Sequence, residues 1–388
     1  IRIAVGAPGT SHARLVVVLL RGGMDGLSLV VPHGDGAYYR ARARIALAPP
    51  GQVDGVLPLD HLFGLHPAAS ALLPWWKAQQ LAFVHASGSP DLTRSHFDAQ
   101  EYLETGTPGR KSTPDGWMNR LASQLGASAS SVEERRMLAV SLGPTMPRVL
   151  QGKAAVASME TGRLADAASA ANAQAVAAFS ETYDPDGPLG RNMQQLTSTR
   201  LEMLAALGST DPMASEATPS PAGLARDVHR LGRLMAADPR VRLAFVPVVG
   251  WDTHVNQGGA RGLLAGKFTL LAQALDALAR GLDRHLQETT VIVLSEFGRT
   301  VQENGNGGTD HGHGNVAILL GAGVRGGKVH GQWPGLESAS LHQGRDLKVT
   351  TDFRSLIAEI LEQRFRLGDP ALSEVLPQTP TSRIGAVT

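Results

Sequence analysis

Residues 290–323 read TVIVLSEFGRTVQENGNGGTDHGHGNVAILLGAG, and this is the most informative stretch for the fold. Two apolar runs, at 291–294 and 316–320, enclose a glycine-rich loop with ionisable side chains. These are Glu296, Arg299, Asp310, His311 and His313. A short apolar run that ends at an acid predicts a buried strand whose end faces a polar site.

Similar apolar runs recur along the chain and predict further strands at residues 14–20, 80–85, 137–141 and 241–249. Helical patterns lie between them, at 154–183, 192–207, 224–237, 261–287 and 351–365, with a loop at 210–222. Ser95 is placed to cap a helix that runs through Tyr102 and stops at Gly106. This alternation predicts an α/β fold with a mostly parallel sheet between helical layers. We expect one domain over residues 1–388, with a helical elaboration at about 150–236.

The composition limits the classes of partner and site that the chain is expected to have. The chain has 388 residues and is 43% hydrophobic, with 36 basic and 35 acidic residues. This balance gives no reason to expect binding to nucleic acid or to an anionic membrane surface. No apolar run reaches the ~18 residues of a membrane span. The absence of cysteine excludes disulfides, cysteine nucleophiles and thiolate metal sites. The chain begins at Ile1, so we expect a removed targeting segment or a trimmed sequence.

Polar clusters follow four of the predicted strands. They are Asp25, then 93–96 (TRSH), then 252–254 (DTH), then Glu296 with Asp310, His311 and His313. Open parallel sheets bind ligands beyond the carboxyl ends of their strands, so these clusters are expected to meet at one edge.

Each cluster also has a structural interpretation. Asp25, among glycines, fits an Asx-turn. The stretch 252–254 fits a loop or a helix cap, and the histidines at 311 and 313 fit a surface turn. Glu296 needs a partner if it is buried, and a salt bridge to Arg299 would supply one.

The functional interpretation is a metal site. Carboxylates with imidazoles suit zinc, manganese or iron better than calcium. Asp252 and His254 would leave the same face of an extended segment. Ser95, at a helix N-terminus that favours an anion, is the expected nucleophile, and Arg94 or Arg299 would hold an anionic substrate.

Several motifs together resemble a known family. They are RGGMDGLSLVVPHGDGAYYR (21–40), LHPA (65–68), SHFDAQEYLETGTPG (95–109), GWMNRL (116–121), GWDTHVNQ (250–257) and SEFGRT…NGNGGTDHGHGN (295–315). From about residue 15 to 362 the chain resembles the Tat-exported bacterial family called domain of unknown function 1501. That family is placed in the alkaline phosphatase and sulfatase superfamily. The resemblance implies a three-layer αβα sandwich, metals at the strand ends and a periplasmic or secreted location.

The resemblance also implies roles for single residues. Metal ligands would be Asp25, Asp252, His254, Glu296 and His311, with Asp310 and His313 as further candidates. Ser95 would attack, with Thr93 in reserve, and His96 would be an acid/base or positioning group.

Two departures from the superfamily pattern leave one metal or two open. Only Thr253 separates Asp252 from His254, where phosphatases have three residues, and Phe297 stands where a metal-binding histidine is usual. A formylglycine sulfatase is disfavoured, because the chain lacks both cysteine and a Ser-x-Pro-x-Arg context at Ser95.

We therefore expect an exported metal-dependent hydrolase of phosphate or related esters, including sulfate esters. The attacking group would be Ser95 or a metal-bound hydroxide. Zinc is the expected metal, with manganese and iron as alternatives, and the partner is a small anionic ester. A hydrolase of an amide is a further possibility. The alternative from another class is a non-catalytic periplasmic binding or scaffold protein with a degenerate metal site. The substrate and the oligomeric state stay open.

Overall fold

A computed structural model describes residues 12–127, 131–143, 145–161 and 221–388. Three features predicted from the sequence lie outside these described residues. They are the helix at 192–207, most of the helix at 154–183 and nearly all of the loop at 210–222. The larger part of the predicted helical elaboration also lies outside them.

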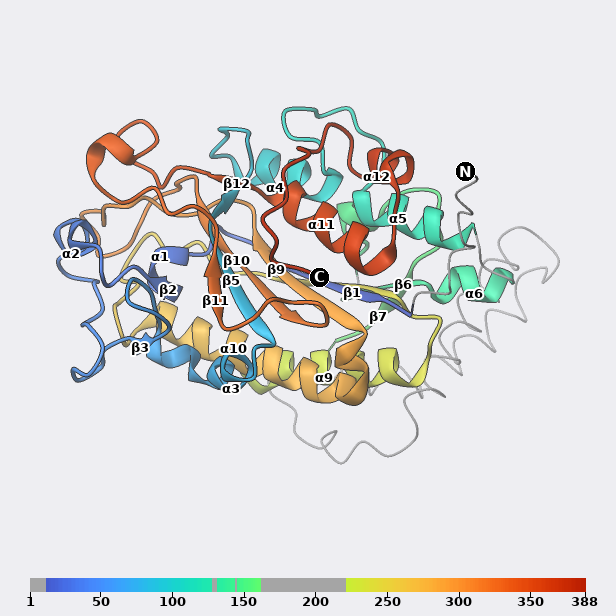
Figure 1. The fold of residues 1–388 in the computed structure, drawn as a ribbon, viewed down its shortest axis with the longest axis horizontal. Helices are drawn as coiled ribbons and strands as arrows, with labels where there is room; N and C mark the ends of the chain where they lie inside the picture. Colours follow the sequence, from blue (N-terminus) through green and yellow to red (C-terminus); the bar gives the residue numbers. More distant parts are fainter. Residues whose placement is uncertain (1–11, 128–130, 144, 162–220) are drawn as a thin grey trace, which may run out of the picture.

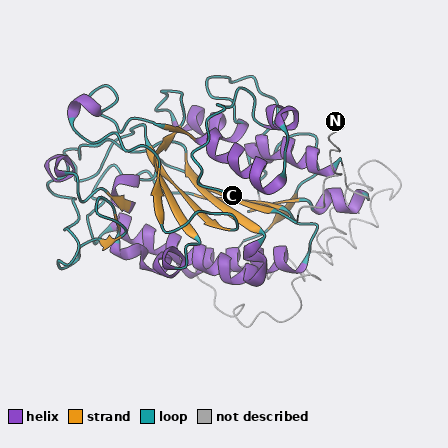
Figure 2. Ribbon diagram, viewed as in Figure 1, coloured by secondary structure: helices purple, strands orange, loops and turns teal. Residues whose placement is uncertain are grey.

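The centre of the molecule is a nine-stranded sheet (Figures 1 and 2). Eight strands follow the order β11-β5-β10-β9-β1-β8-β6-β7, and β12 pairs with β5. Their bounds are Lys328–His330 (β11), Leu81–Gly88 (β5), Asn315–Gly321 (β10), Thr289–Ser295 (β9), Arg14–Leu20 (β1), Leu243–Val248 (β8), Ala139–Leu142 (β6), Ala157–Met159 (β7) and Thr351–Asp352 (β12). Strand β10 is antiparallel to β5 and β9, and the other recorded pairings are parallel. The predicted mostly parallel sheet is confirmed.

Helices cover both faces of this sheet (Figures 1 and 2). One layer contains α3 (Leu73–Lys77), α9 (Pro221–Ala237) and α10 (Leu263–Leu282). The other contains α4 (His96–Thr105), α5 (Trp117–Gly126), α11 (Phe353–Phe365) and α12 (Asp369–Val375). Strand β1 shows why two layers are needed, because all seven of its residues are buried. Val16 and Val18 belong to the core under α10, while Leu15 and Val17 belong to the core under α11. The predicted three-layer αβα sandwich is confirmed.

The remaining elements are short. At the left of Figure 1 lie α1 (Gly26–Leu29), α2 (Gly36–Ala41) and a small antiparallel sheet of β2 (Val30–Val31), β4 (Gly64–Leu65) and β3 (Leu57–Pro58). Helix α6 (Val132–Met137) precedes β6. Four 3-10 helices complete the described residues: η1 (Pro67–Leu72), η2 (Arg148–Leu150), η3 (Asp283–Gln287) and η4 (Ser338–Ser340). The single helix predicted at 261–287 is α10 followed by η3.

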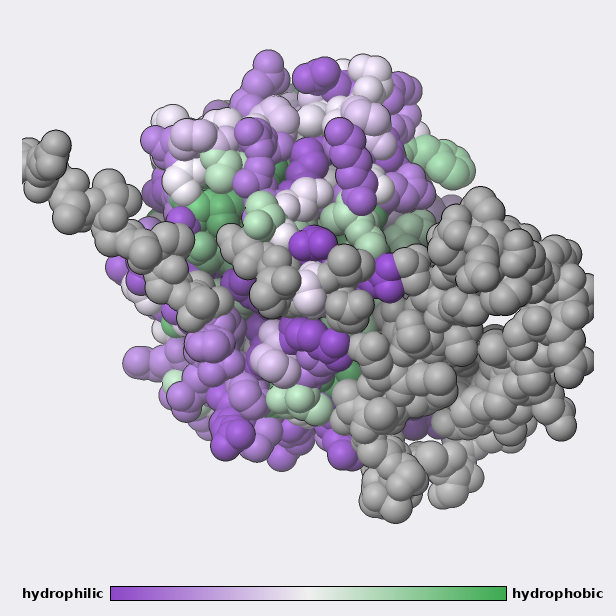
Figure 3. Space-filling view, turned by 90° about the vertical axis from the view of Figure 1, so that its right-hand side faces the viewer, coloured by the Kyte–Doolittle hydropathy of each residue, from purple (hydrophilic) through white to green (hydrophobic). Residues whose placement is uncertain are grey.

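The surface of the described residues is mixed. On the side shown in Figure 3, their hydrophilic side chains predominate, with apolar ones in small scattered groups. None of the helices within the described residues is both long enough and apolar enough to cross a membrane.

The strand register brings the polar loops together at one edge of the sheet. Leu20, the last residue of β1, lies opposite Val248 of β8 and Ser295 of β9, which also end there. Strand β5 runs in the same direction as β9, because both are antiparallel to β10. The segments after β1, β5, β8 and β9 therefore leave the sheet at the same edge, as the sequence predicted.

Candidate metal centre

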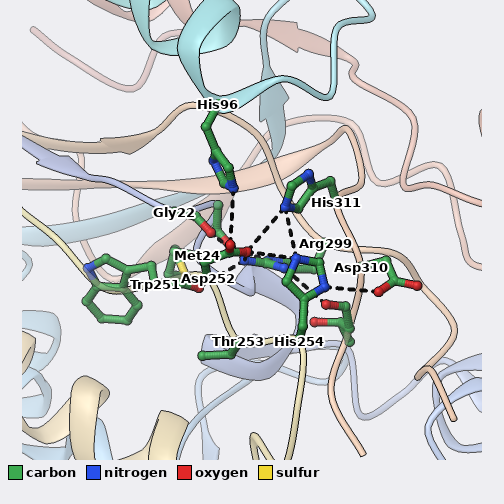
Figure 4. Close-up of polar contacts among 12 residues, drawn as sticks. Gly22, Met24, His96, Trp251, Asp252, Thr253, His254, Arg299, Asp310 and His311 are labelled. Carbon is green, nitrogen blue, oxygen red and sulfur yellow. Dashed lines mark hydrogen bonds and ion pairs between the residues drawn. The ribbon is translucent and has the colours of Figure 1, made fainter. Parts of the chain in front are cut away.

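Three imidazoles and one carboxylate converge at this edge of the sheet (Figure 4). We call His96, Asp252, His254 and His311 the three-histidine cluster. Asp252 Oδ1 lies 3.0 Å from His254 Nε2 and 3.2 Å from His311 Nε2, and Asp252 Oδ2 lies 3.5 Å from His96 Nε2. The two Nε2 atoms of His254 and His311 are 3.0 Å apart. The ligand atoms of His96, Asp252 and His311 lie within 4.8 Å of one another, and His254 joins them through its contacts with Asp252 and His311.

The opposite nitrogen of each histidine is held by an acceptor. His96 Nδ1 lies 2.8 Å from Glu296 Oε1, and His254 Nδ1 lies 3.0 Å from Asp310 Oδ1. His311 Nδ1 lies 2.9 Å from the backbone carbonyl oxygen of Arg94. Carboxylate and carbonyl oxygens only accept hydrogen bonds, so each Nδ1 carries the proton and donates it. This is the arrangement in which metal-binding histidines are usually held.

The tautomers have a consequence for the centre of the cluster. With Nδ1 protonated, the Nε2 atom of each neutral imidazole carries a lone pair and no proton. The lone pairs of His254 and His311 then face each other and Asp252 across about 3 Å, which is favourable only with a cation or a proton between them. The Nε2 atom of His96 is buried and has no hydrogen-bond partner among the described residues. The cluster is therefore built to receive a positive charge.

Local backbone geometry places these side chains. Helix α4 begins at His96 because Ser95 caps it, with Ser95 Oγ accepting from the N–H of Asp98 at 3.4 Å. Gly22 has φ +121°, and a Cβ there would lie 2.5 Å from the backbone nitrogen of Asp252. A Cβ on Gly308 would lie 2.4 Å from the carbonyl group of His254. The loops that carry the cluster therefore pack backbone against backbone, which only glycine allows.

Glu296 holds the Nδ1 side of the His96 ring, opposite the nitrogen that faces Asp252. Its carboxylate is buried and accepts hydrogen bonds from His96, from Gln100 at 2.9 Å and from the N–H of Gly22 at 2.8 Å. Burial acts to raise the pKa of Glu296, but these hydrogen bonds outweigh it and lower the pKa. The same hydrogen bond is the main cause of a raised pKa for His96. Glu296 therefore orients an imidazole and does not itself face the centre.

Arg299 is paired with Asp252 rather than with Glu296, so the salt bridge considered from the sequence is wrong. Its guanidinium is buried and donates to Asp252 Oδ1 at 2.6 Å and to backbone carbonyls, including those of Thr309 and Trp251. Burial acts to raise the pKa of Asp252, but the hydrogen bond and charge of Arg299 outweigh it and lower the pKa. Arg299 fixes one oxygen of Asp252 and has no exposed face for a substrate.

Asp25 lies outside the three-histidine cluster. It is fully buried, and its Oδ2 accepts from Arg42 at 2.6 Å, Gln257 at 2.8 Å and Ser28 at 2.9 Å. Burial acts to raise the pKa of Asp25, but the charge of Arg42, together with the hydrogen bonds from Arg42, Gln257 and Ser28, outweighs it and lowers the pKa. This carboxylate thus lies in a buried ion pair with Arg42, and the metal role expected from the sequence stays a prediction for its other oxygen, Oδ1.

The expected nucleophile, Ser95, is exposed at the N-terminus of α4, next to His96. Thr93 Oγ1 accepts from the N–H of Ser95 at 3.2 Å. Arg94, expected to hold the substrate, is turned away: it donates to Asp346 at 2.7 Å and to Gln343 at 3.0 Å.

Asp310 and His313, the further candidates, differ in position. Asp310 orients His254, and its pKa is lowered by a hydrogen bond from Asn304. His313 is buried against His342, with ring centroids 5.1 Å apart, and burial lowers its pKa to about 4. His313 thus lies beside the cluster rather than in it.

Asp346 is a supporting residue that the sequence pattern did not reveal. It is fully buried and binds both Arg94 and Arg345, whose nitrogens lie 2.7 Å and 3.4 Å from its oxygens. Both arginines hold His311, Arg94 through its carbonyl oxygen and Arg345 by donating to the carbonyl oxygen of His311 at 3.0 Å. No apolar run precedes Asp346, so no strand end marked it. Gln100 had a detectable signal, because it follows His96 by one helical turn.

The family model described as "Protein of unknown function (DUF1501)" matches residues 74–378 of the chain. The search of curated proteins gave no match.

Solved structures give distant likenesses. The chain is similar to the C-terminal periplasmic domain of EcEptC from Escherichia coli in complex with Zn, with 11% identity, 96% of this chain and 89% of that chain covered, and a TM-score of 0.42. It is similar to a protein in the alkaline phosphatase superfamily from Vibrio parahaemolyticus, with 13% identity, coverage of 83% and 63%, and a TM-score of 0.38. A third likeness is to alkaline phosphatase from the Antarctic bacterium TAB5, with 11% identity, coverage of 81% and 93%, and a TM-score of 0.35.

Proposed function

The chain belongs to the DUF1501 family, and we propose that it is a metal-dependent hydrolase of phosphate or related esters. One observation carries the proposal: three Nε2 atoms with free lone pairs converge on the carboxylate of Asp252. The proposed ligands are His96, Asp252, His254 and His311.

The cluster fits a divalent transition metal in its donor types and its spacing. Ligand atoms of a tetrahedral zinc ion, ~2.0–2.1 Å from the metal, are about 3.3 Å apart. The separations of 3.0, 3.2 and 3.5 Å to Asp252, and 3.0 Å between His254 and His311, lie around that value. Imidazole with carboxylate favours zinc, with manganese and iron as alternatives. A bound metal would supply Lewis-acid activation of an ester oxygen or of a water molecule.

Other residues of the chain orient the proposed ligands or supply the attacking group. Glu296 and Asp310 hold the Nδ1 protons of His96 and His254, and so fix the tautomers that bind metal. Ser95 is the proposed attacking hydroxyl, because it is exposed beside His96 at a helix N-terminus. Arg94 and Arg299 are both paired, so we assign neither to the substrate.

A second function has a specific observation in its favour. Arg299 lies 2.6 Å from Asp252 Oδ1 and places a fixed positive charge beside the proposed metal. Such a charge lowers the affinity for a cation and suits a binding or scaffold protein with a degenerate site. Export to the periplasm, which the family resemblance implies, remains a prediction for either function, and fractionation of cells tests it.

Metal analysis of the purified protein, followed by calorimetric titration of the metal-free protein with zinc, manganese and iron, tests the site. We expect about one ion per chain, and a loss of affinity of at least about 100-fold in His254→Ala. His61→Ala is the matched control, because His61 is exposed and outside the cluster. Equal affinity in both variants would rule out the cluster as the metal site.

Turnover separates the two functions. The metal-loaded protein should hydrolyse at least one member of a panel of phosphate monoesters, phosphate diesters and sulfate esters, and His254→Ala should not. Metal binding without turnover across the panel would instead support the binding or scaffold function.

A further inference from the structure

A cavity lies at the edge of the sheet opposite to the three-histidine cluster. Its volume is about 380 Å³, and its lining includes Gln79, Arg325, Gly326, Lys328, His330 and Gly385. Gln79 precedes β5, and Lys328 pairs with Ala82 near the start of that strand. Helix α4 follows the end of β5, whose length is roughly 25 Å at ~3.3 Å per residue. The cavity is therefore separate from the three-histidine cluster.

The walls of this cavity are fixed by close backbone contacts. A Cβ on Gly326 would lie 2.3 Å from the carbonyl carbon of Gln79, so only glycine allows this approach. The N–H of Arg325 donates to the carbonyl oxygen of Ala386 at 2.9 Å, which joins the loop to the 384–387 segment. That segment is held in turn by the buried carboxylate of Glu359, which accepts from the N–H of Gly385 at 3.1 Å. A site with such walls needs little reorganisation to bind a ligand.

The cavity is basic. Arg325 and Lys328 line it with exposed side chains, and neither forms an ion pair with any residue that the structure describes. Among the described residues that line it there is no aspartate or glutamate. The nearby acid Glu359 is committed to backbone N–H groups of the 384–387 segment, at 3.0 Å from Ile384 and 2.6 Å from Val387. Two uncompensated cations around a concave surface attract an anion.

His330 adds a hydrogen-bond acceptor. Its Nε2 donates to the carbonyl oxygen of Arg325 at 2.8 Å, since a carbonyl only accepts. Burial lowers the pKa of His330, which keeps the ring neutral near pH 7. The Nδ1 atom of the neutral ring then carries a lone pair that accepts from a hydroxyl group.

We propose that this cavity binds a small hydroxylated organic anion, whose phosphate or carboxylate group pairs with Arg325 and Lys328 and whose hydroxyl group donates to His330. The guanidinium of Arg325 suits a planar, two-point contact with such an anion. A volume of about 380 Å³ fits a ligand of the size of a phosphorylated or carboxylated sugar.

Calorimetric titration of the whole protein, freed of metal so that the proposed hydrolase cannot turn over a phosphate ester, tests the proposal with D-glucose 6-phosphate, D-gluconate, inorganic phosphate and, as a neutral control, D-glucose. We expect D-glucose 6-phosphate or D-gluconate to bind more tightly than inorganic phosphate, and D-glucose not to bind. The preferred group, phosphate or carboxylate, follows from which of the two binds. Arg325→Gln/Lys328→Gln should weaken that binding by at least about tenfold, because each lost charge-assisted hydrogen bond is worth more than a neutral one.

Arg110→Gln/Lys153→Gln is the matched control, since it removes two exposed charges elsewhere and should leave binding unchanged. His254→Ala should also leave it unchanged, which separates this site from the proposed metal centre. The proposal is overturned if none of the anions binds, if the Arg325/Lys328 variant binds like the wild type, or if His254→Ala abolishes binding.

Discussion

Two carboxylates at the same edge of the sheet have opposite surroundings. Asp25 is fully buried, and the guanidinium of Arg42 lies 2.6 Å from its Oδ2. Asp252 has a side chain that is 45% exposed and is surrounded by imidazole nitrogens that carry lone pairs. Each carboxylate has one arginine of the protein beside it, Arg42 or Arg299, both at 2.6 Å, but only around Asp252 do imidazole lone pairs leave room for a further cation. An acid after a strand is therefore better evidence of a metal site when lone-pair donors such as imidazoles gather around it than when an arginine is its main partner.

The two regions are linked by one side chain. Gln257 donates to Asp25 through Nε2, and its Oε1 accepts from Thr253 at 3.1 Å and from Thr309 at 3.0 Å. Thr253 lies between two residues of the three-histidine cluster, so the buried network holds the loop that carries them. The buried surroundings of Asp25 therefore help to position the loop that carries Asp252 and His254.

The largest effect is expected at Asp25. Asp25→Ala leaves the buried charge of Arg42 without a partner and should lower the free energy of unfolding by about 3–5 kcal/mol. Urea denaturation of the metal-free protein measures this. The double variant Asp25→Ala/Arg42→Met should recover part of the loss, because it removes both charges.

The metal content of the same variants tests whether Asp25 differs from Asp252 in not binding metal. Asp25 Oδ1 is buried and has no hydrogen-bond partner among the described residues, which leaves one oxygen open to the metal role expected from the sequence. If Asp25→Ala keeps its stability but loses bound metal, Asp25 is a ligand and the contrast with Asp252 fails.

The next effect is expected at Asp346. Asp346→Asn weakens the hold on Arg94 and Arg345, which orient His311, and should lower metal affinity by roughly 10- to 100-fold. Asp238→Asn is the matched control: Asp238 is buried, pairs with Arg240 at 2.7 Å and precedes β8, at the opposite edge of the sheet from the cluster. It should lose stability and keep its metal affinity. An equal loss of affinity in both variants would mean that general destabilisation is responsible.

A smaller effect is expected from pH, which should change metal binding at His96 and the stability contribution of Asp25 in different ranges. His96 has a raised pKa, so protons should compete with metal for its Nε2 already as the pH falls through values above 6.5, its ordinary pKa. Asp25 has a lowered pKa, so its contribution to stability is present above the unfolded value of 3.8 and is lost only as the pH falls through the lower folded value. We expect metal affinity to fall by about tenfold per pH unit below the pKa of His96, while cooperative unfolding persists at pH 5.5. Metal titrations and thermal denaturation from pH 8 to 5 measure both quantities, and unchanged affinity across this range would exclude His96 as a ligand.

The sheet could be predicted from the sequence because its buried strands are continuous apolar runs. The runs at 14–20 and 291–294 lie in β1 and β9, and the glycine after the capped helix at Ser95 is where α4 ends. The prediction that the polar loops meet at one edge of the sheet required only that the strands pair in parallel.

The partners within the site could not be predicted in the same way. The sequence placed Glu296 and Arg299 together, but Arg299 reaches Asp252 and Glu296 meets His96, 200 residues earlier in the chain. Sequence distance carries no information about which loops face each other at a sheet edge. The role of Asp346 depends on contacts of its arginines with His311, which no local pattern encodes.

The smallest effect on stability is expected at Ser95. Its Oγ accepts one hydrogen bond from the N–H of Asp98 at 3.4 Å, so Ser95→Ala should cost only about 0.5–1 kcal/mol. Metal should be retained, because Ser95 is not among the proposed ligands. If Ser95 is the attacking hydroxyl, turnover of an ester should nevertheless fall by orders of magnitude, because covalent attack is lost. Ser95→Gly is the matched control, since glycine keeps much of the capping preference and also lacks the hydroxyl. Both variants should be equally inactive whatever their stabilities. Turnover at the wild-type rate in either variant would leave Ser95 as a helix cap alone, and would make water the attacking group.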